Sequence, residues 1–237
     1  MNSKLVHDPV NGRLRVIGFV SGSGNTLWKA LELEREITAN GEECPFEIVG
    51  VFSSRPDAKA RNTAEAEGIP YASLDIKEFH KKHDAPISDM EVRALFDTEV
   101  SKLIEPFGAD IILLAGYVWA TTNVILDKYK AVNVHPADLS VMDGNERIFA
   151  GANGVGDTIS HKYPDICSSS HIATNEVDGG PLLMLSPSFE IDYEIEDEEI
   201  LKRTVLKEVN NQSRHLGART IYEIAMGNFS LDEQRNC

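Results

Sequence analysis

The sequence predicts an α/β protein built on a doubly wound, mostly parallel, Rossmann-like sheet. Short apolar segments of strand length alternate with segments of helical periodicity up to residue 136. Residues 111–115 form an almost continuous apolar run, which is typical of a central parallel strand buried on both faces. The chain is long enough for one large α/β domain. We therefore expect a single domain over residues 1–237, with residues 13–136 as its nucleotide- or phosphate-binding half.

The first half is expected to contain five strands and four helices. The strands are the short segments rich in apolar residues, at residues 13–20, 47–52, 69–72, 110–115 and 131–134. The helices are the segments with apolar residues three and four apart, at residues 27–37, 56–67, 90–107 and 121–129. Right-handed crossovers place the strand-to-helix loops at one edge of such a sheet. We therefore expect the loops that follow the first, fourth and fifth strands to lie together.

The second half has a different character. Residues 144–159 are polar and rich in glycine, with a weak helical signal. Residues 167–173 and 182–191 are predicted to be a C-terminal pair of strands separated by a turn at Asp178. Residues 198–226 are predicted to be one long helix, whose continuity is left open at two consecutive asparagines. The acidic stretch 190–199 fits either a strand or a loop that leads into this helix.

Composition restricts the possible partners. The formal net charge of −15 argues against a nucleic-acid partner, because binding phosphates requires a basic surface. The apolar runs are too short to span a bilayer, and residues 1–12 lack the apolar core of a signal peptide, so we expect a cytoplasmic protein. Cys44, Cys167 and Cys237 have no metal-binding or redox spacing and are expected to be free thiols. We expect no metal, and either a monomer or a homodimer.

The end of the fifth strand carries residue types suited to catalysis. Asn133 and His135 are two apart, so both side chains point to the same side of the strand, and Pro136 ends it. Asp178, in the glycine-rich turn, is expected to supply a carboxylate that orients the imidazole. An amide donor beside an imidazole suits acyl transfer, which requires a donor for an oxyanion and a carrier for a proton. The alternative is a structural histidine and an ordinary turn.

A glycine-rich loop between the first strand and the first helix is a candidate anion site. It consists of Gly22, Ser23, Gly24, Asn25 and Thr26. A dinucleotide fingerprint would require a third glycine where Leu27 stands, and no lysine follows as in a nucleotide-binding P-loop. The loop therefore favours a phosphomonoester or another small anion. The alternative is a simple turn between a strand and a helix.

Five segments together resemble the phosphoribosylglycinamide formyltransferases (glycinamide ribonucleotide transformylases) within the formyltransferase family. The segments are residues 19–27, 51–54, 114–117, 132–136 and 170–181, and the resemblance extends from about residue 16 to residue 227. It implies transfer of a formyl group from the co-substrate 10-formyltetrahydrofolate to the amine of glycinamide ribonucleotide, a small-molecule reaction of de novo purine biosynthesis. It also implies direct transfer, without a covalent enzyme intermediate, and makes residues 137–237 the folate-binding and catalytic half.

The resemblance assigns roles to the residues that match its motifs. Asn133 would bind the formyl oxygen, His135 would be a second stabiliser and move protons, and Asp178 would keep His135 charged and help a water shuttle protons. That pairing predicts a raised pKa for His135. The loop 22–26 would take the acceptor's phosphate. The folate would lie against Gly116, Tyr117, Val118, Trp119, Ala120, Thr174, Asn175, Glu176 and Val177. His171 matches a family position near the site, and a core role for it stays open.

The chain also departs from the family pattern. The loop 137–152 differs from the family's sequence beside the acceptor, and Trp119 stands near a position that is usually basic. Asn211 and Arg214 are the candidate acceptor contacts, and Arg214 replaces a glutamate near the acceptor's ribose. Three alternatives therefore stay open. They are transfer to another amine, such as an amino sugar nucleotide or an amino acid derivative, hydrolysis of the formylfolate, and a non-catalytic folate- or ligand-binding relative.

Overall fold

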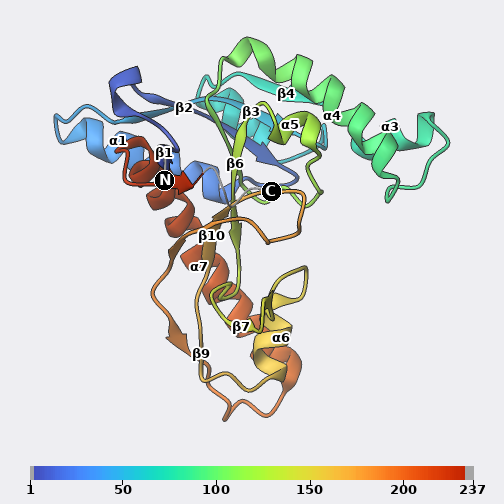
Figure 1. The fold of residues 1–237 in the computed structure, drawn as a ribbon, viewed down its shortest axis with the longest axis vertical. Helices are drawn as coiled ribbons and strands as arrows, with labels where there is room; N and C mark the ends of the chain where they lie inside the picture. The colour runs from blue at the N-terminus through green and yellow to red at the C-terminus, as the bar shows by residue number, and fades with distance from the viewer. Residues whose placement is uncertain (1–2, 233–237) are drawn as a thin grey trace.

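The computed structural model describes residues 3–232 and has a seven-stranded sheet at its centre (Figure 1). The strand order is β11-β10-β6-β5-β2-β3-β4. These strands are β2 (Leu14–Val20), β3 (Phe46–Ser53), β4 (Tyr71–Ser73), β5 (Ile111–Leu114), β6 (Lys130–His135), β10 (Ser169–Ile172) and β11 (Leu182–Leu185). The five strands from β6 to β4 are parallel, and β10 runs antiparallel to both of its neighbours. The predicted α/β class with a mostly parallel sheet is confirmed.

Helices cover both faces of the sheet, as a doubly wound fold requires. They are α1 (Asn25–Ala39), α2 (Ala60–Ala66), α3 (Ile76–Lys82), α4 (Met90–Ile104), α5 (Asn123–Leu126), α6 (Gly154–Ser160) and α7 (Glu198–Ala225), with short 3-10 turns η1 (Pro9–Asn11) and η2 (Glu105–Phe107). One apolar core contains Leu27 of α1 and Ile221 of α7. A second core, on the other face, contains Phe96 of α4 and Ile125 of α5. The two cores bury the central strands on both sides, which explains their continuous apolar sequence.

Helix α3 was not predicted from the sequence. It is a single short helix of seven residues, and Asp75 caps it by accepting hydrogen bonds from the backbone N–H groups of Lys77 and Glu78. The predicted helix at residues 56–67 is shorter in the structure, because residues 55–58 form a turn before α2. The other predicted elements of the first half are present with boundaries shifted by a few residues.

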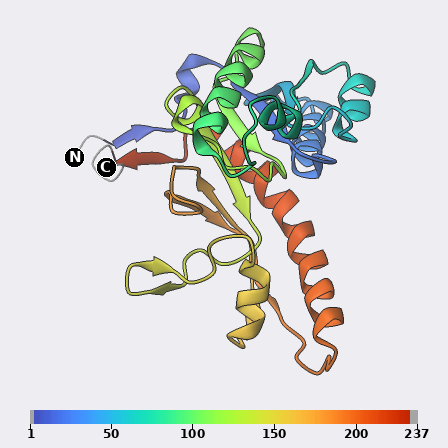
Figure 2. The same cartoon turned by 90° about the vertical axis from the view of Figure 1, so that its right-hand side faces the viewer.

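The second half is organised around α7. This helix is continuous through Asn210 and Asn211, which are both exposed and so do not interrupt its packing. Its N-terminal part packs in a third apolar core with Ile159 of α6 and Ile166 of β9 (Asp165–Ile166). Figure 2 shows α7 extending well beyond the sheet to reach this region. The acidic stretch begins at the end of β12 (Phe189–Glu190), continues as a loop to Asp197, which caps α7, and ends with Glu198 and Glu199 in the first turn of that helix.

Two small ribbons complete the architecture. β7 (Met142–Asp143) and β8 (Glu146–Arg147) form a short antiparallel hairpin within the loop 137–152, which the sequence did not predict. β1 (Ser3–Leu5) pairs antiparallel with β13 (Ser230–Asp232) near the two ends of the described chain (Figure 2). No helix of residues 3–232 is both long enough and apolar enough to cross a membrane.

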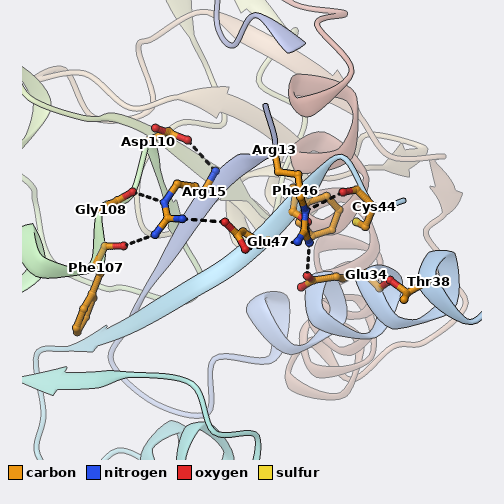
Figure 3. A network of polar contacts seen from close by, with 10 residues as sticks. All are labelled: Arg13, Arg15, Glu34, Thr38, Cys44, Phe46, Glu47, Phe107, Gly108 and Asp110. Atoms are coloured by element: carbon orange, nitrogen blue, oxygen red, sulfur yellow. Dashed lines mark hydrogen bonds and ion pairs between the residues drawn. The ribbon is translucent and has the colours of Figure 1, made fainter. Parts of the chain in front are cut away.

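A polar network fixes the amino-terminal edge of the sheet, opposite the carboxyl ends of the parallel strands (Figure 3). Arg13 donates hydrogen bonds to Glu34 and to the carbonyls of Cys44 and Phe46. Arg15 bonds to Glu47 and to the carbonyls of Phe107 and Gly108, and its own backbone N–H donates to Asp110. The side chains at this edge hold neighbouring loops together. The carboxyl ends of the parallel strands, at the opposite edge, are the expected place for a site.

Candidate active site

The structure brings Asn133, His135 and Asp178 together at the carboxyl end of β6. Asn133 and His135 project from β6, and Asp178 reaches them from the turn between β10 and β11. The Asn133 Nδ2 donates to Asp178 Oδ1 over 3.2 Å, and His135 Nδ1 lies 3.2 Å from Asp178 Oδ2. One carboxylate thus links the two β6 side chains. His135 and Asp178 are both buried, which strengthens every electrostatic interaction among them.

The Asp178 turn has a constrained backbone. Asp178 itself adopts φ +52°, in the left-handed region that most residues avoid. A Cβ on Gly180 would lie 1.9 Å from the carbonyl oxygen of Ile172, so only glycine allows the turn to pack this closely against β10. Gly180 is therefore required by the close approach of two backbone segments. The turn is held in a single conformation that directs the carboxylate toward β6.

His171 is the fourth member of this network. It projects from β10, opposite Asn133 in the register, and its Nε2 lies 3.1 Å from Asn133 Nδ2 and 3.2 Å from Asp178 Oδ1. Its Nδ1 lies 3.0 Å from the carbonyl oxygen of Ile172. Its Nε2 accepts from Asn133 when Nδ1 carries the ring hydrogen, and donates to Asp178 Oδ1 when Nε2 carries it. The sequence left the role of His171 open, and the structure places it in contact with the candidate catalytic groups.

The pKa of Asp178 is lowered to about 2. Burial acts to raise this pKa, but the hydrogen bond with His171, the nearby His135 and the backbone N–H of Gly151 together outweigh burial. The Gly151 N–H donates to Oδ2 over 2.8 Å. Asp178 is therefore ionised at neutral pH and acts as a fixed negative charge between two imidazoles.

The pKa of His135 is lowered, so the sequence-based prediction of a raised value was wrong. The predicted pair with Asp178 does form, and it favours the charged ring, as does the carbonyl of Phe149 at 2.7 Å from Nε2. Burial outweighs both effects because it penalises the charged form. The neutral ring has one N–H to share between two oxygen acceptors. His135 is thus a neutral imidazole at pH 7 with a capacity to accept a proton.

The glycine-rich loop lines a small pocket of about 350 Å³. Gly24 adopts φ +68° immediately before α1, which turns the loop at the start of the helix. The indole N–H of Trp28 donates to the carbonyl of Ser23 over 2.5 Å and holds the loop from the first turn of α1. All five loop residues singled out in the sequence line this pocket, namely Gly22, Ser23, Gly24, Asn25 and Thr26.

Helix α7 forms the other wall of the small pocket. Asn210, Ser213 and Arg214 line it, and Arg214 places a guanidinium group opposite the glycine-rich loop. Asn211 is exposed and is not among the lining residues, because the helical turn presents Asn210 at that place. A cation facing a helix N-terminus across a pocket of this size is suited to a small anion such as a phosphate.

A larger cavity of about 810 Å³ adjoins the small pocket at the end of β6. Its walls include the four residues of the carboxylate network. Of the residues expected to contact a folate, Gly116 lines the small pocket instead. The others all line the larger cavity, namely Tyr117, Val118, Trp119, Ala120, Thr174, Asn175, Glu176 and Val177. Val134 and Pro136 line both cavities, so the two spaces meet at the end of β6. The volume is in the range of pockets that enclose a cofactor-sized organic molecule.

The segment around Trp119 is held from behind by a buried arginine. Arg93 of α4 donates to the carbonyl of Ala120 over 3.1 Å, and its guanidinium lies over the Trp119 ring at 5.3 Å from the centroid. Trp119 also donates to Ser54 Oγ over 3.1 Å. The cavity wall is therefore rigidly supported, although the basic residue usual near Trp119 in the family is absent.

Sequence reasoning missed three groups from the loop 137–152. Arg147 donates to the backbone carbonyl of Asp178, the Phe149 carbonyl faces His135 Nε2, and the Gly151 N–H donates to the Asp178 carboxylate. Two of these are backbone groups, which leave no signal in a sequence. The third is a side chain on a loop without recognisable periodicity, so nothing in the sequence indicated that it faces Asp178.

The described cysteines and acidic clusters offer no further chemistry. Cys44 and Cys167 are buried free thiols, and burial raises the pKa of Cys167 to about 12, so it is not a reactive thiolate. Cys237 lies outside the described residues. Within residues 3–232, no group of three or more histidine, cysteine, aspartate or glutamate side chains is arranged to hold a metal ion.

Comparisons with known proteins match this chain to one family. The family model for formyl transferases matches residues 14–215. The trifunctional purine biosynthetic protein adenosine-3 of Bos taurus is 26% identical over 178 residues, which is 73% of this chain and 15% of that protein. The methionyl-tRNA formyltransferase of Rickettsia canadensis is 28% identical over 179 residues, which is 74% of this chain and 50% of that protein. The chain thus spans half or less of these two relatives.

A solved structure shows the same fold. Glycinamide ribonucleotide transformylase 1 from Symbiobacterium toebii superposes with a TM-score of 0.73 at 21% sequence identity, covering 94% of this chain and 92% of that chain. The likeness extends over nearly the whole of both chains.

Proposed function

The chain belongs to the formyl transferase family, and we propose that it transfers a formyl group from 10-formyltetrahydrofolate to the amine of glycinamide ribonucleotide, a reaction of purine biosynthesis. One observation carries this proposal: the network of Asn133, His135 and Asp178 lies where a large cavity meets a small pocket at the end of β6. The reacting groups of two substrates held in these two spaces would meet beside that network.

The two spaces suit the two substrates. The larger cavity has mainly apolar walls, with Trp119 and Tyr117 offering aromatic surface for a pterin and its benzoyl group. The smaller pocket offers the glycine-rich loop, the start of α1 and Arg214, which together suit a phosphate. The amine of glycinamide ribonucleotide would then extend from the phosphate pocket past Pro136 toward Asn133.

Formyl transfer requires stabilisation of negative charge on the formyl oxygen. The Asn133 amide is the donor placed to supply it. In the structure its hydrogens are directed to His171 Nε2 and Asp178 Oδ1, so one of them turns to the substrate oxygen when substrate binds. The ionised Asp178 accepts from the amide nitrogen and so fixes the orientation of the Asn133 side chain at the cavity wall. The transfer is direct, and no covalent enzyme intermediate is needed.

Formyl transfer also requires the amine to lose a proton. A neutral His135 can accept a proton from the amine, directly or through a water, and its proximity to Asp178 stabilises the charge that results. The proton then passes to N10 of the folate, which leaves as tetrahydrofolate when the bond between N10 and the formyl carbon breaks. This differs from the role implied by the family resemblance, in which His135 is charged before the reaction. The lowered pKa of His135 favours the role of a base.

A second candidate is transfer to another phosphorylated amine. Arg214 places a cation at the pocket where the family pattern has a glutamate, and the loop 137–152 forms a hairpin that departs from that pattern. The related proteins named above also differ in their acceptors. A tRNA acceptor is disfavoured here, because the net charge of −15 would repel a polyanion.

The proposal is tested by measuring formyl transfer from 10-formyltetrahydrofolate, or its deaza analogue, to glycinamide ribonucleotide by absorbance. We expect turnover in the native protein and a loss of about 10²- to 10⁴-fold in kcat for His135→Ala. His83→Ala is the matched control, since His83 is an exposed histidine of the α3 terminus and should leave kcat unchanged. Folate binding without turnover would contradict this acceptor and direct a screen toward other amines. Absence of both would contradict the proposed activity.

A further inference from the structure

The loop 137–152 holds the candidate catalytic pair, although it is the segment that departs most from the family pattern. Its contacts are the Arg147 guanidinium on the backbone carbonyl of Asp178, the Phe149 carbonyl on His135 and the Gly151 N–H on the Asp178 carboxylate. Phe149 and Gly151 contribute backbone groups, which any residue could supply. Arg147 contributes a side chain, so its contact depends on the identity of the residue.

Arg147 donates to a residue that has an unfavourable backbone conformation. Asp178 has φ +52°, a left-handed conformation that is unfavourable for a residue other than glycine. The Gly151 and Asn133 donors hold its carboxylate, whereas Arg147 holds its backbone carbonyl. Without Arg147 the turn can relax toward an ordinary conformation. Because the carboxylate lies 3.2 Å from both imidazoles, even a small rotation of the turn would separate it from one of them.

Arg147 also places a positive charge beside the pair. The charged and titratable groups that face His135 are Asp178 from the turn, His171 from β10 and Arg147 from β8. Arg147 and His171 oppose the protonation of His135, and Asp178 favours it. Arg147 thus compensates part of the carboxylate's charge and helps keep the ring neutral. It is half-buried and forms the last residue of the short hairpin, so this charge is fixed in position.

We propose that Arg147 is a positioning residue that acts through Asp178, holding its carboxylate between the two imidazoles and keeping His135 in the form that accepts a proton. The kinetic part of this inference rests on the proposed formyl transfer. The structural part, which concerns the state of His135, does not.

The test compares Arg147→Met with Arg147→Lys and with Glu146→Gln. Glu146 is the neighbouring exposed residue of the same strand of the hairpin and is the matched control. We expect Arg147→Met to lower kcat by about 10- to 100-fold with little change in KM for the formyl donor, because the substrate contacts are intact. NMR titration should show a shifted His135 pKa in Arg147→Met, upward where the loss of the opposing positive charge dominates and downward where the Asp178 carboxylate moves away from the ring. Arg147→Lys should restore the His135 pKa and recover part of kcat.

Two outcomes would overturn the proposal. In one, Arg147→Met matches Glu146→Gln in both kcat and His135 titration. In the other, kcat falls but the titration is unchanged and lysine recovers nothing, which would mean a purely structural role. If Arg147→Met does not fold, Arg147→Gln replaces it, because glutamine keeps an amide donor without the charge. If the native protein transfers no formyl group, the proposed function fails, and the titration alone decides the role of Arg147.

Discussion

Replacing Asp178 with asparagine should reduce stability by an amount that depends on pH. The carboxylate is buried between His135 and His171 and accepts hydrogen bonds from Asn133 and Gly151. These contacts lower its pKa from the ordinary value of 3.8 to about 2 in the folded protein. Asparagine has nearly the same shape and can still accept from Gly151. The substitution therefore removes the charge and little of the packing.

The magnitude follows from the linkage between protonation and folding. A pKa of about 2 in the folded state against 3.8 in the unfolded state contributes about 2 kcal/mol to the free energy of unfolding at pH 7. The side chain is 8% exposed, so solvent screens little of this contribution. Because the folded pKa is the lower one, the contribution is full above pH 4 and is lost as the pH falls toward 2. It should be reduced to about half at pH 3.

The assay is urea unfolding at 25 °C, followed by circular dichroism, at several pH values from 7 to 2.5. The native protein should exceed Asp178→Asn by about 2 kcal/mol at pH 7. The difference should not shrink between pH 7 and pH 4. Loss of the carboxylate lowers the His135 pKa further in the folded variant, so protonation of the unfolded chain in mild acid destabilises the variant more than the native protein. Asp143→Asn, at the exposed tip of the hairpin, is the control. A difference that is absent at pH 7, or that stays constant down to pH 2.5, would refute the reasoning.

Three further outcomes are expected. Gly18→Ala should lower the free energy of unfolding by about 1 to 3 kcal/mol, because the new Cβ would lie 2.3 Å from Leu27 Cδ2 in the core. Gly22→Ala is the control in the same denaturation experiment. It should change the free energy of unfolding much less, because no atom lies within 4 Å of the new Cβ. Arg214→Gln should raise KM for the phosphorylated acceptor by about 10-fold with kcat nearly unchanged, and equal KM values would argue against a phosphate at this pocket. NMR should find His135 titrating below 6.5, with a further decrease when its carboxylate partner becomes an amide, and a value above 6.5 would show that burial does not dominate.

The sheet could be predicted because its signals are local. The apolar run that became β5 and the alternation of strands and helices directly report burial on both faces. Helix α3 left no such signal, since seven residues complete only two turns and its identity depends on the Asp75 cap. The hairpin of β7 and β8 was missed for a similar reason, because each strand contributes two residues.

The candidate site could be predicted only where side chains follow a strand. Asn133 and His135 share one side of β6, so their spacing indicated their proximity, and the turn at Asp178 is joined to them by the antiparallel strand β10. The protonation state of His135 could not be predicted, because it depends on how completely the loop 137–152 covers the ring. Burial is a property of the assembled fold, and here it reverses the sign expected from the carboxylate alone.

The loop 137–152 affects both the identity of the acceptor and the geometry of the candidate catalytic groups, which the sequence analysis considered separately. Its departure from the family pattern raised the question of the acceptor, while in the structure its Arg147 and Phe149 contact the Asp178 turn and His135. A change in this loop therefore alters the catalytic groups along with any acceptor contact. Arg214, by contrast, approaches the proposed phosphate pocket from α7 and has no contact with the carboxylate network among the described hydrogen bonds and ion pairs. Under the proposed function, acceptor selection at α7 can thus vary independently of catalysis, whereas variation in the loop is constrained by its contacts with Asp178.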